Sequence, residues 1–323
     1  MTFRGVAIVL FSVTAFTLTF MLEGYELYRF TLAAAYAIAI LGINLLTGLS
    51  GQFSIGHSAF FLVGAYGTAI TMQYTDLGAY GGLALAAVGS FVSGFLFGWP
   101  ALRLSMVHLA LTTWGLALAV PQLLKSRFLE PLTGGVQGIY LERPEPPAGV
   151  ALSDDQWWYL VVLITLLVAI TLAGNLIHSR TGRALVAIRD NEIAAAPMGI
   201  NVSAYKTLIF GLSAALAGIA GGFVALLIDF VAPDSYTFMF GALLLIGAVA
   251  GGLQSAWGAI FGGLFVQFLP DLSSSASTML TMPAQGFVLL ALIYLFPLGI
   301  AGEITHRLPC MNRPKPERID TQA

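Results

Sequence analysis

The sequence has 323 residues, of which 58% are hydrophobic and only 9% are charged. Soluble domains carry about 25% charged residues, so this composition excludes a soluble single-core protein and indicates an integral membrane protein. The formal net charge of −2 predicts no nucleic-acid partner. The single cysteine, Cys310, cannot form an internal disulfide, and no Cys/His spacing indicates a metal site. We therefore expect no metal, no cofactor and no catalytic residue.

Long apolar segments follow one another along the chain. They are continuous rather than alternating, which favours transmembrane helices over lipid-facing strands. We predict an all-α integral membrane protein with about ten transmembrane helices, and the long loop after the fifth segment favours two five-span halves. The eighth and ninth segments are short and flanked by glycines, so each is predicted as a half-helix or as part of one broken pair. The ten segments are 5–22, 30–47, 57–73, 81–99, 104–120, 157–177, 206–228, 240–252, 258–270 and 284–302.

Lysine and arginine residues set the predicted orientation. With the N-terminus inside, ten of the 14 bases fall on the inner side of these segments and four on the outer side. Both termini are therefore predicted to be cytoplasmic. The transmembrane domain covers 1–302, with a cytoplasmic loop at 178–206 and a periplasmic loop at 121–156, and 303–323 forms a cytoplasmic tail.

Two glycine-rich stretches interrupt the apolar pattern at matching places in the two halves. The first runs from Gly48 to Gly67 and the second from Gly247 to Gly263. The first overlaps a polar motif that reads LTGLSGQFSIGHSAFFLVGAY from Leu46 to Tyr66. Polar groups at membrane depth are costly and often line a transport pathway, although each of them could instead hold helices together. The candidate residues of the translocation path are Ser50, Gln52, Ser54, His57, Gln254 and Trp257.

A polar, alanine-rich segment separates two long apolar runs. It reads GRALVAIRDNEIAAAPMGINVSAYK from Gly182 to Lys206. Its pattern predicts two short helices along the membrane surface, the first capped by Thr181 and the second by Asn191. Gly199 suits the turn that follows. A docking element for a cytoplasmic partner is the favoured interpretation, and a solvated connecting loop is the alternative.

These motifs, together with GGLQSAWGAIFGG from Gly251 to Gly263, resemble the inner-membrane permeases of branched-chain amino acid ABC importers, of the LivM type. The resemblance covers about residues 30 to 302. It implies a multi-pass protein of the bacterial inner membrane that is surrounded by lipid and paired with a second, H-type permease subunit. It also implies two cytoplasmic ATPase subunits that bind the polar loop and a periplasmic substrate-binding protein that delivers the cargo.

The resemblance carries the ATPase-docking role onto particular positions of the loop. Glu192, Ala194, Ala195 and Gly199 match the family's motif. The general importer loop reads EAA with a glycine three residues later, whereas this chain reads EIAAAPMG, so the spacing departs by one residue. The full set of predicted docking residues is Arg183, Arg189, Asn191, Glu192, Ala194, Ala195 and Gly199.

Other functions remain as alternatives. None of the three lysines follows a glycine, so a phosphate-binding P-loop is absent and ATP hydrolysis would take place on a partner. The chain is then a translocation subunit and not an enzyme.

The same machine could carry urea, short amides or aromatic acids. An ion-coupled secondary transporter would need ionisable residues in mid-membrane, and the segments hold almost none. An intramembrane serine protease would use Ser50 of the GLSG string and a histidine base.

Overall fold

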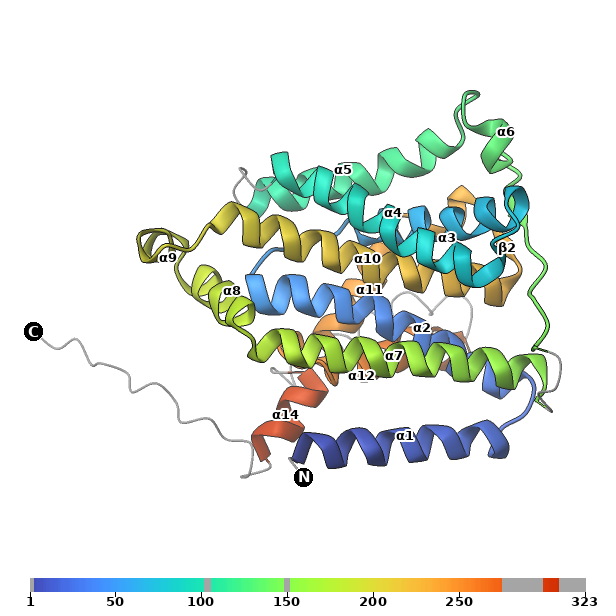
Figure 1. The fold of residues 1–323 in the computed structure, drawn as a ribbon, viewed down its shortest axis with the longest axis horizontal. Helices are drawn as coiled ribbons and strands as arrows, with labels where there is room; N and C mark the ends of the chain where they lie inside the picture. Colours follow the sequence, from blue (N-terminus) through green and yellow to red (C-terminus); the bar gives the residue numbers. More distant parts are fainter. Residues whose placement is uncertain (1–2, 102–105, 148–151, 275–298, 308–323) are drawn as a thin grey trace, which may run out of the picture.

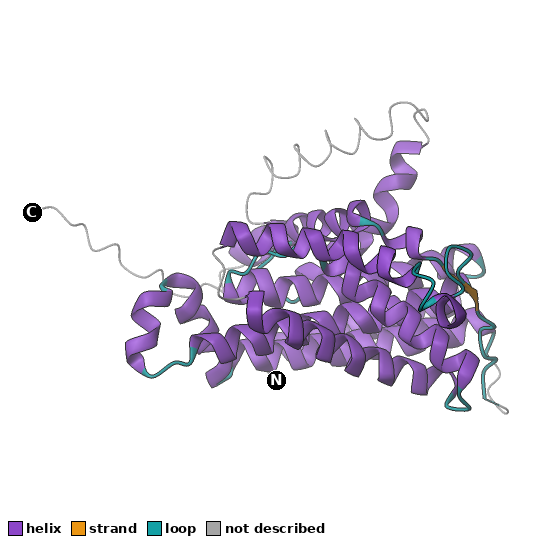
Figure 2. Cartoon of the chain, turned by 90° about the horizontal axis from the view of Figure 1, so that it is seen from above, coloured by secondary structure: helices purple, strands orange, loops and turns teal. Residues whose placement is uncertain are grey.

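The computed structural model describes residues 3–101, 106–147, 152–274 and 299–307. Helices make up most of this part of the chain (Figures 1 and 2). The elements are α1 (Phe3–Met21), α2 (Tyr25–Ile43), η1 (Asn44–Leu49), α3 (His57–Tyr74), α4 (Gly78–Ala101), α5 (Met106–Leu124), α6 (Glu130–Thr133), β1 (Ile139–Tyr140), α7 (Asp154–His178), α8 (Arg180–Asp190), α9 (Glu192–Ala195), η2 (Ala196–Met198), α10 (Val202–Ile228), β2 (Phe230–Val231), η3 (Pro233–Tyr236), α11 (Phe238–Gly251), α12 (Gly258–Ser274) and α14 (Gly299–Arg307).

The prediction of an all-α membrane protein is confirmed. Nine of the ten predicted segments coincide with helices, and the tenth, 284–302, lies almost entirely outside the described residues. Among the described helices, four stretches are long and apolar enough to cross a membrane, and shorter apolar helices accompany them. α11 has 14 residues, or about 21 Å at 1.5 Å per residue, which is less than the ~30 Å hydrocarbon core. The four long stretches are Tyr25–Leu49, Gly78–Pro100, Asp154–His178 and Val202–Ile228.

α10 lies at the centre of the bundle, between α3 and α4 on one side and α2 on the other. α2 in turn packs against α7 and α12. Glycines set the close approach of α10 to α3, because a Cβ atom on Gly64 would overlap the backbone of Gly218, and one on Gly221 would overlap the Phe61 carbonyl. Small residues at helix crossings let backbones come close, which is how helices associate in lipid.

The two ends of the bundle differ. α8 and α9 project at one end, where α1 begins and α14 lies, while α6, β1 and β2 lie at the opposite end (Figure 1). We call these the α8 end and the α6 end. β1 and β2 form a short antiparallel pair that pairs Ile139 with Val231. Strand pairing was not expected from the sequence, because two residues per strand leave no readable alternation.

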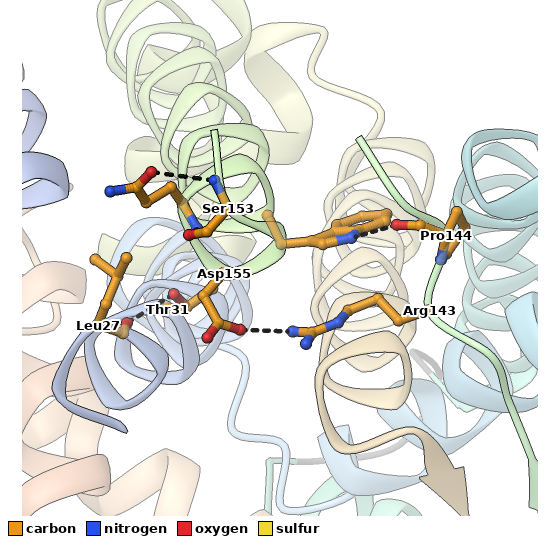
Figure 3. A network of polar contacts seen from close by, with 8 residues as sticks. Leu27, Thr31, Arg143, Pro144, Ser153 and Asp155 are labelled. Carbon is orange, nitrogen blue, oxygen red and sulfur yellow. Dashed lines mark hydrogen bonds and ion pairs between the residues drawn. The ribbon is translucent and has the colours of Figure 1, made fainter. Parts of the chain in front are cut away.

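Side-chain contacts anchor the connection between α5 and α7 at the α6 end. Helix α5 runs through Pro121 to Leu124, so the connection is shorter than the predicted loop. At its far end, Arg143 forms an ion pair with Asp155 at 3.1 Å, and the Trp158 indole donates to the Pro144 carbonyl (Figure 3). Ser153 and Gln156 close a capping box at the start of α7. These contacts fix the described residues on both sides of the gap at 148–151.

Asp229 ends α10 with a positive φ of 59°, the only such value outside glycine among the described residues. Its carbonyl accepts a hydrogen bond from the Leu141 amide, which joins α10 to the connection that follows β1. Burial raises the pKa of the Asp229 carboxyl, Arg143 acts in the opposite direction, and Asp155 adds to the rise.

Candidate functional site

The segment between α7 and α10 folds as two helical pieces. Ser179 caps the first, α8, because its hydroxyl accepts a hydrogen bond from the Gly182 amide. The expected cap at Thr181 is therefore wrong, since Thr181 already lies inside the helix. Leu185 and Ile188 are buried, so α8 packs one apolar face against the bundle, as the amphipathic pattern predicts.

The second piece consists of α9 and η2. Asn191 caps α9 as predicted, with its side-chain oxygen accepting from the Ala194 amide. Gly199 ends η2 with a φ of +82°, the left-handed turn expected there. Ile193 and Met198 are 87% and 83% exposed. Neither apolar residue was singled out from the sequence, although both stand out in a polar segment.

The predicted docking residues divide into an exposed and an inward-facing group. Ala195 is buried and Arg189 is half-buried. The Glu192 carboxylate forms an ion pair with Lys206 at the start of α10, which ties α9 to a long central helix. The exposed group, which a partner could reach, is Arg183, Asn191, Glu192, Ala194 and Gly199.

The first glycine-rich stretch breaks the helix between α2 and α3. α2 ends in the π-helical turn η1, and residues 51–56 then form no regular structure before α3 begins. Ser50 and Gln52 are buried. The Ser50 hydroxyl donates to the Leu46 carbonyl, and the Gln52 amide donates to Ser50 Oγ and to the Lys206 carbonyl. The bonds from Ser50 and Gln52 give partners to two backbone carbonyls near the break, and irregular backbone inside a membrane protein needs such partners.

His57 joins three parts of the bundle at the start of α3. Ser213 Oγ on α10 donates to the Gly42 carbonyl at 2.7 Å, so it accepts from His57 Nε2 at 2.6 Å. The Ser54 hydroxyl lies 3.1 Å from Nδ1. Both ring nitrogens are thereby satisfied, and His57 links α2, α3 and α10. Ser213 was not singled out from the sequence, because its partner lies 156 residues away.

The second glycine-rich stretch breaks the chain between α11 and α12, over residues 252–257. The two breaks touch. The Asn44 amide of η1 donates to the carbonyls of Gly252 and Ser255, at 3.4 and 3.2 Å. Trp257 packs its ring edge against Phe11 of α1, with ring centroids 5.9 Å apart. A single asparagine inside the second apolar segment was the signal in the sequence that could have identified Asn44.

A pocket of about 160 Å³ lies where α8, η1 and the second break meet. Its walls are mainly aliphatic, and its polar lining comes from Asn44, Arg189, Gln254 and Ser255. Of the six predicted path residues, Gln254 lines this pocket. The path role of all six residues stays a prediction.

The chemistry of an enzyme is not assembled around Ser50. Its hydroxyl donates to its own helix, while both nitrogens of His57 are engaged by Ser54 and Ser213. Among the described contacts, Ser50 of the GLSG string therefore has no hydrogen bond to His57. Over the described part of the chain, no group of His, Cys, Asp and Glu side chains could hold a metal ion.

Comparison with known proteins matches residues 27–297 to the family model described as "Branched-chain amino acid transport system / permease component". The high-affinity branched-chain amino acid transport system permease protein LivM of Salmonella typhimurium is 31% identical over 288 residues, 82% of this chain and 67% of that protein. A second permease protein of such a system, LivH of Escherichia coli K12, is 27% identical over 84% of this chain and 92% of its own length. BraD of Pseudomonas aeruginosa is 24% identical over 291 residues. No solved structure matches this chain.

Proposed function

The chain belongs to the family of branched-chain amino acid transport system permease components, and from that membership we propose that it is the translocation subunit of an ABC importer for branched-chain amino acids. Family membership is the observation that carries this proposal. The relatives named LivM and LivH are permease proteins of branched-chain amino acid transport systems. This chain would then pair with a second permease subunit. ATP hydrolysis by two ATPase subunits would drive the transport.

The loop with α8 and α9 is the proposed ATPase-docking element. It projects from the bundle at one end (Figure 1) and exposes Ile193 and Met198. Large apolar side chains exposed together outside a hydrophobic bundle are typical of a protein contact. The Glu192–Lys206 ion pair and the buried face of α8 connect the same loop to the transmembrane helices. A partner that moves this loop would therefore also move the helices.

We place the α8 end in the cytoplasm of a bacterial inner membrane. Arg180, Arg183, Arg189 and Lys206 gather at this end, and basic residues are retained on the cytoplasmic side. α1 begins at this end, and α14 lies there too (Figure 1), which agrees with two cytoplasmic termini. The α6 end would face the periplasm and receive cargo from a substrate-binding protein.

Uptake of labelled leucine tests the proposed cargo. Cells that express this chain with its partner subunits should take up leucine, and unlabelled isoleucine or valine should compete. Strong competition by urea, short amides or aromatic acids, without competition by isoleucine, would assign the same machine to another cargo. Uptake that follows an ion gradient and continues without ATP would support a secondary transporter instead.

A further inference from the structure

Arg189 points away from the surface that a docking partner would reach. Its Nη1 donates a hydrogen bond of 2.7 Å to the Gly48 carbonyl in η1 of the first break. Gly48 lies in the last turn of the helical stretch, where backbone carbonyls have no intrahelical partner. The guanidinium therefore satisfies an orphan carbonyl in the transmembrane bundle from a helix of the loop.

Gly51 holds the stem of this arginine in place. It has a φ of +71°, and a Cβ atom at Gly51 would lie 2.8 Å from Arg189 Cγ. Any larger residue would thus displace the arginine as well as strain the backbone. Nε and Nη2 of Arg189 both donate to the neighbouring Asp190 carboxylate, so the head group is held on two sides.

The other side of Gly48 faces the second break. A Cβ atom on Gly48 would overlap the Leu253 carbonyl, so the two backbones are in direct contact. One helical turn earlier, the Asn44 amide donates to Gly252 and Ser255. η1 is thus held by α8 on one face and holds the α11–α12 break on the other. The pocket of about 160 Å³ beside them leaves room for these elements to shift.

We propose that Arg189 is a positioning residue that couples the docking loop to the break between α11 and α12, through Gly48 and Asn44. The inference rests on the proposed function, because it takes ATPase-driven motion of the loop as its input. When α8 moves, the bond to Gly48 pulls η1, and Asn44 carries the displacement to residues 252–255. Packed helices transmit such shifts because they switch between discrete arrangements.

Substitutions at the two ends of this chain of contacts test the proposal in the full complex reconstituted in lipid. Arg189→Met keeps the apolar stem but removes every donor, Arg189→Lys restores one cationic donor, and Asn44→Leu removes the bonds to the second break. Arg180→Met is the matched control, because Arg180 is exposed on the same helix, α8, and is not among the predicted docking residues. The measured quantities are bound ATPase subunit, ATP hydrolysis, and leucine transported per ATP.

Arg189→Met and Asn44→Leu should keep the bound ATPase and its hydrolysis, while leucine transported per ATP falls about tenfold, the scale of one lost charge-assisted hydrogen bond. Arg189→Lys should recover most of the leucine transported per ATP, and Arg180→Met should keep the wild-type value. The double variant of Arg189→Met and Asn44→Leu should be no worse than either single variant. In a background with Cys310→Ser, the thiol of Ser255→Cys should change its reactivity on ATP addition, and Arg189→Met should abolish that change.

An unchanged ratio in Arg189→Met would overturn the proposal. Loss of the ATPase subunit from Arg189→Met would also overturn it, because Arg189 would then be a docking contact. If Asn44→Leu transported as much leucine per ATP as the wild type, Asn44 would not carry the displacement to residues 252–255, and the proposed route would be wrong. A wild-type complex that hydrolyses ATP but transports no leucine would instead refute the proposed function, so the two failures are distinguishable.

Discussion

At the residue scale, buried polar side chains act as connectors between elements distant in sequence. Asn44 bonds to residues more than 200 positions away, and His57 bonds to Ser213 over 156 positions. A buried donor without an acceptor costs about 1–3 kcal/mol. Loss of one of these bonds would therefore destabilise the fold mainly because a buried polar group would be left without a partner. The hydrogen bonds that Ser50 and Gln52 donate serve the same purpose around the first break.

Ser213→Ala tests this role of a buried connector. The change removes the acceptor of His57 Nε2 and the donor to the Gly42 carbonyl, so the stability of the folded protein in detergent should fall by about 1–3 kcal/mol. Ser93→Ala is the control, because Ser93 donates to the Ser90 carbonyl in its own helix. Thermal unfolding of both variants should show a lower midpoint for Ser213→Ala alone. Equal midpoints would refute the connector role.

At the element scale, two features were predictable and a third was not. The apolar segments predict the helices, and the composition of 182–206 predicts an amphipathic surface helix, a second short helix capped by Asn191 and a turn at Gly199. The inward direction of Arg189 was not predictable, because its acceptor is a backbone carbonyl 141 residues away. A backbone acceptor has no side-chain signature, and the π-helical turn that presents it has none either.

The close crossing of α4 and α10 depends on glycine. Gly218→Val would drive a side chain into Ser90 and the α4 backbone, which should destabilise the bundle by about 1–3 kcal/mol through overpacking. Gly89→Ala is the matched control, because nothing lies within 4 Å of the added Cβ. An alanine in mid-helix should be neutral or gain up to about 1 kcal/mol. Unfolding in detergent distinguishes the two, and equal stability of both variants would contradict the close crossing.

The loop with α8 and α9 should hold the ATPase through its exposed apolar residues. Ile193→Asp places a charge at a position that is 87% exposed, so the fold should persist while the amount of co-purified ATPase falls about tenfold or more, as for a central interface residue. Phe128→Asp is an equally exposed control at the α6 end. Undiminished ATPase binding by Ile193→Asp, or an equal loss in both variants, would refute this docking surface.

At the scale of the whole molecule, the two helix breaks meet near the loop that carries α8 and α9. The sequence predicted paired interruptions in two halves, and the structure places them in contact through Asn44. It could not predict that contact, because hydropathy locates a break along the chain but not the break that faces it. The proximity of the α8–α9 loop to both breaks supports the proposal that partner subunits drive this permease.

The central claim is that this chain works as the path of an ATP-driven importer. The most direct measurement is ATP hydrolysis by the chain assembled with its second permease and ATPase subunits in lipid discs, with and without a leucine-loaded binding protein. We predict that the loaded protein stimulates hydrolysis above the level seen with the unloaded protein. Failure of the chain to assemble with any ATPase subunit would contradict the account.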